Sequence, residues 1–172
     1  MRRMRLPVLL AIMLLGIVGT ALAANGNFAT HLKSREEVPP VGVVIDSRAQ
    51  GQAIFHLSED GNTLEYKLIA SNIDNVVQAH IHLGPVGVNG PIVAFLYGPV
   101  APGAGRHDGV LSEGTITAAN LVGPLAGHPL SDLIAAIQDG GAYVNVHTND
   151  GIAPVNTGPG DFPGGEIRGQ LP

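Results

Sequence analysis

The 172-residue chain has no cysteine and no tryptophan, and its three methionines all lie within the first thirteen residues. Without thiols the chain cannot form a disulfide, so a folded domain must be stabilised by its core. Beyond Met13 the chain offers a metal only nitrogen and oxygen ligands. Blue-copper centres and thioether-ligated Cu(I) centres are therefore excluded.

Residues 1–23 are expected to be a signal peptide. Three arginines precede an apolar run over residues 6–20, and Ala21-Leu22-Ala23 is typical of a cleavage site. The apolar run is short for a membrane span, and an uncleaved anchor is the alternative. The absence of cysteine excludes a lipoprotein anchor. We expect a mature domain over residues 24–172, periplasmic or secreted, with no membrane attachment after cleavage.

Positive charge is scarce beyond this leader. Six basic residues remain against fourteen acidic ones, a net charge of −8, and no basic cluster stands out. This balance argues against nucleic acid or an anionic membrane as a partner. The motifs of serine hydrolases, P-loop proteins and dinucleotide-binding enzymes are also absent. A metal ion, with another periplasmic or extracellular protein as a second possibility, is the expected partner.

Alternating apolar and polar residues predict a mostly β structure. Glycine and proline separate the alternating segments, and neither a repeat nor a long linker divides the chain. We expect one antiparallel β-sandwich or barrel with one short helix. The predicted strands lie within residues 51–58, 64–68, 77–83, 92–97, 114–117, 141–148 and 166–171.

The predicted helix spans residues 130–139. Apolar side chains recur there at the i, i+3, i+4 and i+7 positions, and Gly140 follows as a stop signal. The segment from Gly98 to Gly109 is so rich in glycine and proline that we expect a mobile surface loop.

Histidine carries the main functional signal. His80 and His82 are two residues apart in a predicted strand and therefore share one face, with Cα atoms about 6.5–7 Å apart. On a second strand, His147 shares a polar face with Tyr143 and Asn145. If the two strands lie side by side, the three histidines can converge on one metal ion.

Three interpretations of this polar face remain open: a metal site, a solvated sheet face, or a buried hydrogen-bond network without metal. Glu166 and Arg168, a carboxylate and a guanidinium on either side of Ile167, are expected on the same face. His107 in the predicted loop is a possible additional ligand. His56 and His128 are expected to be structural or surface residues.

Four ordered motifs resemble those of the CHRD domain, a module first named from chordin. They are EEVPPV (36–41), AHIHLGPVGVNGPIV (79–93), YVNVHT (143–148) and GGEIRGQL (164–171). The resemblance covers nearly the whole predicted mature chain and implies an extracellular or periplasmic, mostly β domain. Its motifs single out the polar residues Glu37, His80, His82, Asn145, His147, Glu166 and Arg168.

This pattern leads to three functional hypotheses. The first is a periplasmic copper-binding protein for storage, delivery or resistance, with His80, His82 and His147 as ligands. Cu(II) is favoured by the Irving–Williams order, zinc is possible, and water or a mobile ligand fills a fourth position. Metal affinity is expected to fall as the pH drops through roughly 6.5.

The second hypothesis is a metalloenzyme, because the H-x-H strand is similar to part of the copper site of Cu/Zn superoxide dismutases. The third is a metal-free interaction module.

Overall fold

The computed structural model describes residues 26–172. The expected signal peptide, residues 1–23, lies outside this range. Among the described residues, no helix has the length and apolar character needed to cross a membrane.

The described chain is built from eight strands and one short α-helix, α1, at Leu130–Gln138. Three single-turn 3-10 helices connect them: η1 (Ser34–Glu36), η2 (Ala118–Asn120) and η3 (Gly123–Leu125). The strands are β1 (Asn27–Lys33), β2 (Gln50–Leu57), β3 (Leu64–Asp74), β4 (Val76–Leu83), β5 (Ile92–Tyr97), β6 (Arg106–Ile116), β7 (Ala142–Thr148) and β8 (Ile167–Gln170).

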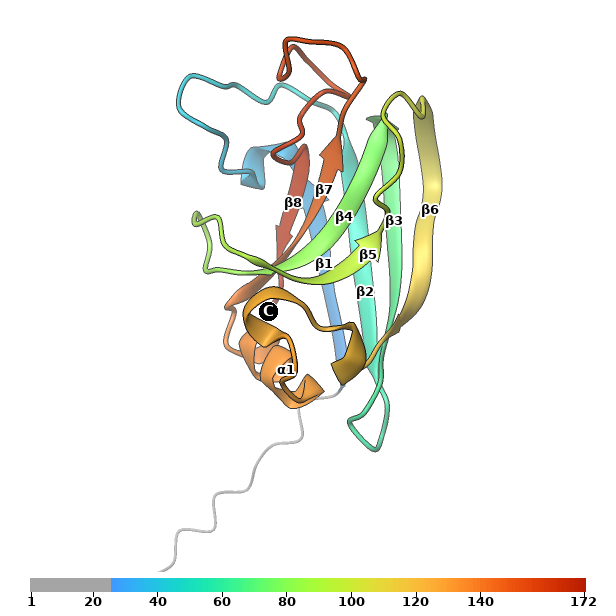
Figure 1. Ribbon diagram of the computed structural model, residues 1–172, viewed down its shortest axis with the longest axis vertical. Coiled ribbons are helices and arrows are strands. Elements are labelled where there is room, and N and C mark those ends of the chain that lie inside the picture. The colour runs from blue at the N-terminus through green and yellow to red at the C-terminus, as the bar shows by residue number, and fades with distance from the viewer. Residues whose placement is uncertain (1–25) are drawn as a thin grey trace, which may run out of the picture.

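All eight strands form one antiparallel sheet in the order β5-β4-β7-β8-β1-β2-β3-β6. The sheet curls until its two edge strands, β5 and β6, approach each other (Figure 1). The hydroxyl of Tyr66 on β3 donates a hydrogen bond to the carbonyl of Leu96 on β5, at 2.8 Å, across this nearly closed seam. The predicted mostly β fold with one helix is confirmed, in the form of a barrel-like sheet.

Two elements differ from the expectation. Strand β1 was not predicted, and β6 begins at Arg106, inside the segment expected to be a loop up to Gly109. The predicted helix is confirmed, and Gly140 after it has a φ of 66°, a left-handed conformation that favours glycine.

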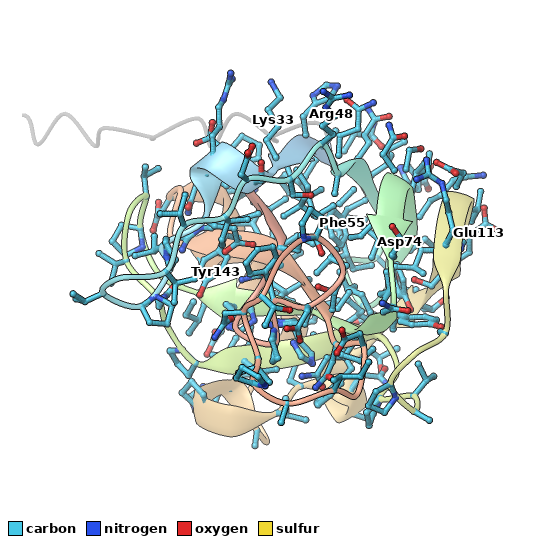
Figure 2. All side chains as sticks on the ribbon, turned by 90° about the horizontal axis from the view of Figure 1, so that it is seen from above. Lys33, Arg48, Phe55, Asp74, Glu113 and Tyr143 are labelled. Carbon is cyan, nitrogen blue, oxygen red and sulfur yellow. The ribbon has the colours of Figure 1, made fainter. Side chains whose placement is uncertain are left out.

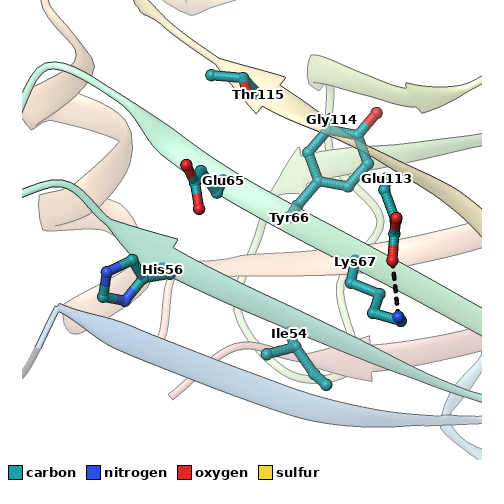
Figure 3. Close-up of a pocket in the computed structure, with 8 residues that line it drawn as sticks. All are labelled: Ile54, His56, Glu65, Tyr66, Lys67, Glu113, Gly114 and Thr115. Atoms are coloured by element: carbon teal, nitrogen blue, oxygen red, sulfur yellow. Dashed lines mark ion pairs between the residues drawn. The ribbon is translucent and has the colours of Figure 1, made fainter.

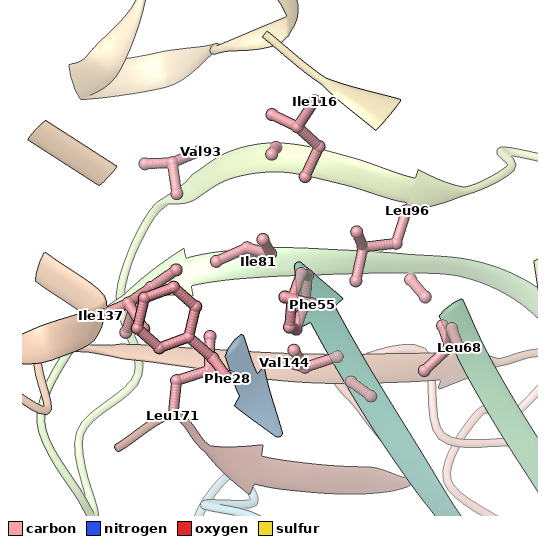
Figure 4. Packing of buried hydrophobic residues seen from close by; sticks show 14 of the residues in the cluster. Phe28, Phe55, Leu68, Ile81, Val93, Leu96, Ile116, Ile137, Val144 and Leu171 are labelled. Atoms are coloured by element: carbon pink, nitrogen blue, oxygen red, sulfur yellow. The ribbon is translucent and has the colours of Figure 1, made fainter. Parts of the chain in front are cut away.

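The apolar core fills the inside of the barrel (Figure 4). On β4 and β7 it takes Ala79, Ile81, Val144 and Val146, all with no exposed surface. Every residue of β7 is nevertheless buried, including those whose side chains point out of the barrel. Loops lie over that outer face, and the long ones after η1 and β7 lie at the end of the barrel opposite α1 (Figure 1). The polar face of the sheet is therefore covered by protein.

Candidate metal centre

Strand register brings the three histidines together on the outer face of β4 and β7. In this antiparallel pair His80 lies opposite Asn145, His82 opposite Tyr143, and Gln78 opposite His147. Because alternate residues of a strand share a face, His80, His82 and His147 all project from the barrel on the same side. The convergence expected from the sequence is confirmed.

This polar face is dry. The exposed fractions are 0% for His80, 7% for His82 and 6% for His147. Figure 2 shows Tyr143 inside the outline of the molecule, whereas Lys33, Arg48 and Glu113 lie at its rim. The interpretation as a solvated sheet face is therefore wrong, because loops exclude water from the imidazole rings.

The imidazole nitrogens are close enough to share one ion. Nδ1 of His80 lies 3.1 Å from Nε2 of His147, and one ligand atom from each of the three rings lies within 4.8 Å of the others. Two metal–nitrogen bonds of about 2.0–2.1 Å to atoms 3.1 Å apart would meet at an angle of about 100°. That angle lies between the square-planar and tetrahedral values, so the residues present fit a four-coordinate transition metal.

Two backbone carbonyl groups orient the rings. Nδ1–H of His82 donates to the carbonyl of Gly90 at 2.9 Å, and Nδ1–H of His147 donates to the carbonyl of Pro163 at 3.0 Å. These bonds place the proton on Nδ1 of both rings, as is usual for metal-binding histidines, so each Nε2 keeps a lone pair, which in His147 faces Nδ1 of His80. Nε2 of His80 and Nε2 of His82 are buried and have no hydrogen-bond partner within the described chain. Because buried polar atoms normally have partners, the orphaned Nε2 of His82 favours a ligand at this point, whereas Nε2 of His80 would stay unpaired with a metal bound at Nδ1 of the same ring.

Burial also holds the rings in the neutral form that binds metals. Desolvation lowers the pKa of His80 to about 3, and the neighbouring His147 and His82 add to the effect. Desolvation lowers the pKa of His147 to about 4. The pKa of His82 is lowered by desolvation as well, although its hydrogen bond to Gly90 opposes the shift. All three imidazoles are therefore neutral at pH 7.

An aromatic ring connects the histidines to a buried cation. The Tyr143 ring stacks on the His82 ring, with centroids 4.8 Å apart and planes 10° apart. Cζ of Arg168 lies 3.4 Å from the centroid of the same Tyr143 ring. The Tyr143 hydroxyl accepts a hydrogen bond from the N–H of Gly90, so Tyr143 and His82 are anchored to one residue. The Arg168 guanidinium, the Tyr143 ring and the His82 ring thus form a stacked column that connects Arg168 to the site.

Glu37 and Asn145 form a second polar contact next to His80. The Asn145 amide donates to Oε2 of Glu37 at 3.3 Å, while Oε1 of Glu37 and Oδ1 of Asn145 are buried without a partner. Desolvation raises the pKa of Glu37 to about 8, although Arg168 and the Asn145 hydrogen bond lower it. Gly165, with a φ of 130°, packs so closely on Asn145 that a Cβ there would lie 2.5 Å from Oδ1.

Glu166 and Arg168, expected on the same face, form no ion pair with each other within the described residues. The buried Glu166 carboxylate accepts hydrogen bonds from the Ser47 hydroxyl, the Thr148 hydroxyl and the Gly160 N–H. These bonds join the long loops after η1 and β7 to the sheet. Glu166 therefore holds the cover of the site in place, and no hydrogen bond links it to a histidine in the part of the chain described.

The other histidines lie elsewhere. His107, a possible additional ligand by sequence, pairs with Ile73 in the β3–β6 ladder and is not part of the histidine cluster. His56 and His128 are exposed and contact Asn27 and Asp132, respectively.

An open groove of about 500 Å³ lies on the outer face of β2, β3 and β6 (Figure 3). It shares no residue with the three-histidine cluster. Its lining residues are Ile54, His56, Glu65, Tyr66, Lys67, Glu113, Gly114 and Thr115, with an ion pair of 2.7 Å between Lys67 and Glu113.

Comparison with protein families matches residues 28–171 to the CHRD domain. The chain belongs to the CHRD domain family. Comparisons with curated proteins and with solved structures found no match. The function of this CHRD domain must therefore be argued from its own residues.

Sequence reasoning missed the groups that orient the ligands in this CHRD domain. The carbonyls of Gly90 and Pro163 carry no side-chain signal, and their positions depend on loop conformation. Phe95, whose ring meets His80 edge-on at a centroid distance of 4.6 Å, was read only as part of a strand. The sequence placed Tyr143 on the correct face. It could not predict that the ring stacks between His82 on β4 and Arg168 on β8, because this contact depends on the order of the strands in the sheet.

Replacing Glu37 with glutamine tests the electrostatics of this site. A pKa raised from 4.5 to about 8 means that the folded state binds a proton which the unfolded state releases. The stabilisation from Glu37 is fully present below pH 4.5 and is lost as the pH rises through about 8. We expect wild type to lose on the order of 4 kcal/mol of unfolding free energy relative to Glu37→Gln between pH 5 and pH 9.

Urea denaturation of the metal-free proteins measures this difference. The control is Glu36→Gln, because Glu36 is the adjacent carboxylate and its side chain is 46% exposed. A constant difference between wild type and Glu37→Gln across this pH range would contradict the buried, protonated state of Glu37.

Proposed function

We propose that this CHRD domain binds one transition-metal ion through His80, His82 and His147 in an extracytoplasmic compartment. The observation that carries the proposal is the geometry of three buried, neutral imidazoles whose Nε2 or Nδ1 atoms face one another. Carbonyl groups fix the tautomers of two rings, and two buried Nε2 atoms have no other partner in the described chain. A hydrogen-bond network alone would leave Nε2 of His82 unsatisfied, whereas an ion shared with Nδ1 of His80 and Nε2 of His147 would satisfy it.

Copper is the favoured ion and zinc the alternative. The ligand set consists of imidazoles, which suit both metals, and affinity for Cu(II) exceeds that for Zn(II) in a given nitrogen site. A role in copper storage, delivery or resistance in the periplasm or outside the cell follows from the signal-like N-terminus and from this site.

Burial favours binding over catalysis. A catalytic metal needs an open position that substrate can reach. Here the three rings are at most 7% exposed, and the outer-face groove does not reach them. We therefore place metal binding ahead of a superoxide-dismutase-like activity, and the metal-free interaction module last.

Alanine replacement of each histidine tests the ligand set. We expect the wild type to bind one copper or zinc ion, and His80→Ala, His82→Ala and His147→Ala each to lose stoichiometric binding. His56→Ala and His128→Ala are matched controls, since both rings are exposed and distant in the fold, and they should bind like wild type. Isothermal titration with each metal measures this. Binding by the three cluster variants at the wild-type level would exclude the site.

The pH dependence of metal binding separates a buried site from an exposed one. Three exposed histidines with a pKa near 6.5 would together lose affinity by about a thousandfold on going to pH 5.5. Because burial lowers the pKa of His80 to about 3 and that of His147 to about 4, protons compete with the metal only at lower pH. Because the pKa of His82 is lowered as well, we expect the Kd at pH 5.5 to stay within about tenfold of its value at pH 7, and the fall in affinity to lie below the pH of roughly 6.5 expected from the sequence. A thousandfold loss would show that the rings are open to water.

A further inference from the structure

We propose that the three-histidine centre selects monovalent copper, Cu(I), over Cu(II), and that the buried guanidinium of Arg168, acting across the Tyr143 ring, strengthens this preference. The inference rests on the proposed copper site and concerns the charge of the ion that the site holds. It departs from the Cu(II) expected from the sequence, because the sequence does not show how completely the rings are covered.

The ligand set adds no negative charge. Within the described residues, the cluster of potential ligand atoms contains three histidines and no carboxylate. Because the imidazoles are neutral, the site with its ion carries the full charge of the ion. The cost of transferring an ion out of water rises with the square of its charge, and the rings here are 0–7% exposed. A monovalent ion therefore incurs a smaller desolvation cost than a divalent one.

Arg168 adds a buried positive charge beside the site. Its side chain is buried, with an exposed fraction of 1%, and it forms no salt bridge within residues 26–172. Its hydrogen bonds go to neutral oxygens only: the carbonyls of Pro85 and Val88 and the side-chain oxygens of Asn89 and Gln170.

Neither carboxyl group of the polar face forms a salt bridge with this cation within the described residues. Glu37 is close enough for Arg168 to influence its pKa, but burial keeps that pKa at about 8, so the carboxyl is mostly protonated at pH 7. Both Glu166 oxygens accept hydrogen bonds from loop and β7 groups and contact no Arg168 nitrogen in the described chain.

The stacked column brings the Arg168 charge close to a ligand. Its Cζ is 3.4 Å from the Tyr143 centroid, which is 4.8 Å from the His82 centroid. The guanidinium carbon thus lies no more than about 8 Å from the centre of a ligating ring, a range over which charges in a protein interact strongly. The intervening ring excludes water from the path. A positive charge here repels a dication twice as strongly as a monocation, which raises the reduction potential of bound copper.

Two competitive titrations on the wild-type protein at pH 7 test the preference. Anaerobic Cu(I) is titrated against bicinchoninate, and Cu(II) against nitrilotriacetate. The ratio of the two dissociation constants gives the reduction potential of the bound ion. We expect a potential above that of the aqueous Cu(II)/Cu(I) couple. A potential at or below that couple would overturn the inference while leaving the metal site intact. Failure to bind either ion stoichiometrically would reject the proposed function itself.

Charge variants test the role of Arg168. Arg168→Gln should reduce the preference for Cu(I) by about tenfold, which corresponds to 59 mV, while Arg168→Lys retains the charge and most of the potential. Asn89→Asp tests the same charge effect without removing a buried side chain, because Asn89 is exposed. Its Oδ1 lies 3.2 Å from Nη1 of Arg168, so a carboxylate there would offset the Arg168 charge. The added negative charge should lower the potential in the same direction.

The control is Asn62→Asp, which makes the same charge change in the exposed β2–β3 turn and should leave the potential unchanged. If Asn89→Asp behaves like Asn62→Asp, or if Arg168→Lys lowers the potential as much as Arg168→Gln, then the Arg168 charge does not act on the site.

Discussion

The hydrogen bonds from His82 to the Gly90 carbonyl and from His147 to the Pro163 carbonyl determine what the polar face can do. Each bond fixes a tautomer and turns an Nε2 lone pair toward the cluster. Both acceptors lie on loops that cover the sheet, so the cover and the ligand geometry form together. Glu166 joins the loops after η1 and β7 to the sheet and so holds the loop that carries Pro163, with no hydrogen bond to a histidine in the described chain.

Covering a polar sheet face imposes a second constraint. Buried polar groups are costly unless they have partners, and several atoms here have none within the described chain. One of them, Nε2 of His82, is an imidazole nitrogen that a metal shared with Nδ1 of His80 and Nε2 of His147 would satisfy. The unpartnered oxygens of Glu37 and Asn145 lie beside His80 in a region where the carboxyl is held protonated. The same desolvation that makes the face costly keeps its histidines neutral and ready to bind.

The sequence predicted much of this arrangement, because period-two alternation determines which side chains share a face. It placed His80, His82 and His147 together before the strand order was known. It missed β1, where Thr30 separates Phe28 from Leu32 and weakens the apolar pattern. It also missed most of β6, where Arg106, Asp108 and Gly109 resemble a loop because the strand has a solvent-facing side. The cover of the polar face depends on loop backbones and long-range contacts such as Asn145 with Glu37, which local patterns do not encode.

A crystal structure of the protein grown with copper, with anomalous diffraction data recorded at the copper absorption edge, would locate the bound ion. We expect one strong anomalous peak about 2.0–2.1 Å from a ring nitrogen of each of His80, His82 and His147. The carbonyls of Gly90 and Pro163 should remain bonded to Nδ1 of His82 and His147. Peaks only at exposed histidines such as His56 or His128, with the cluster empty, would contradict this expectation.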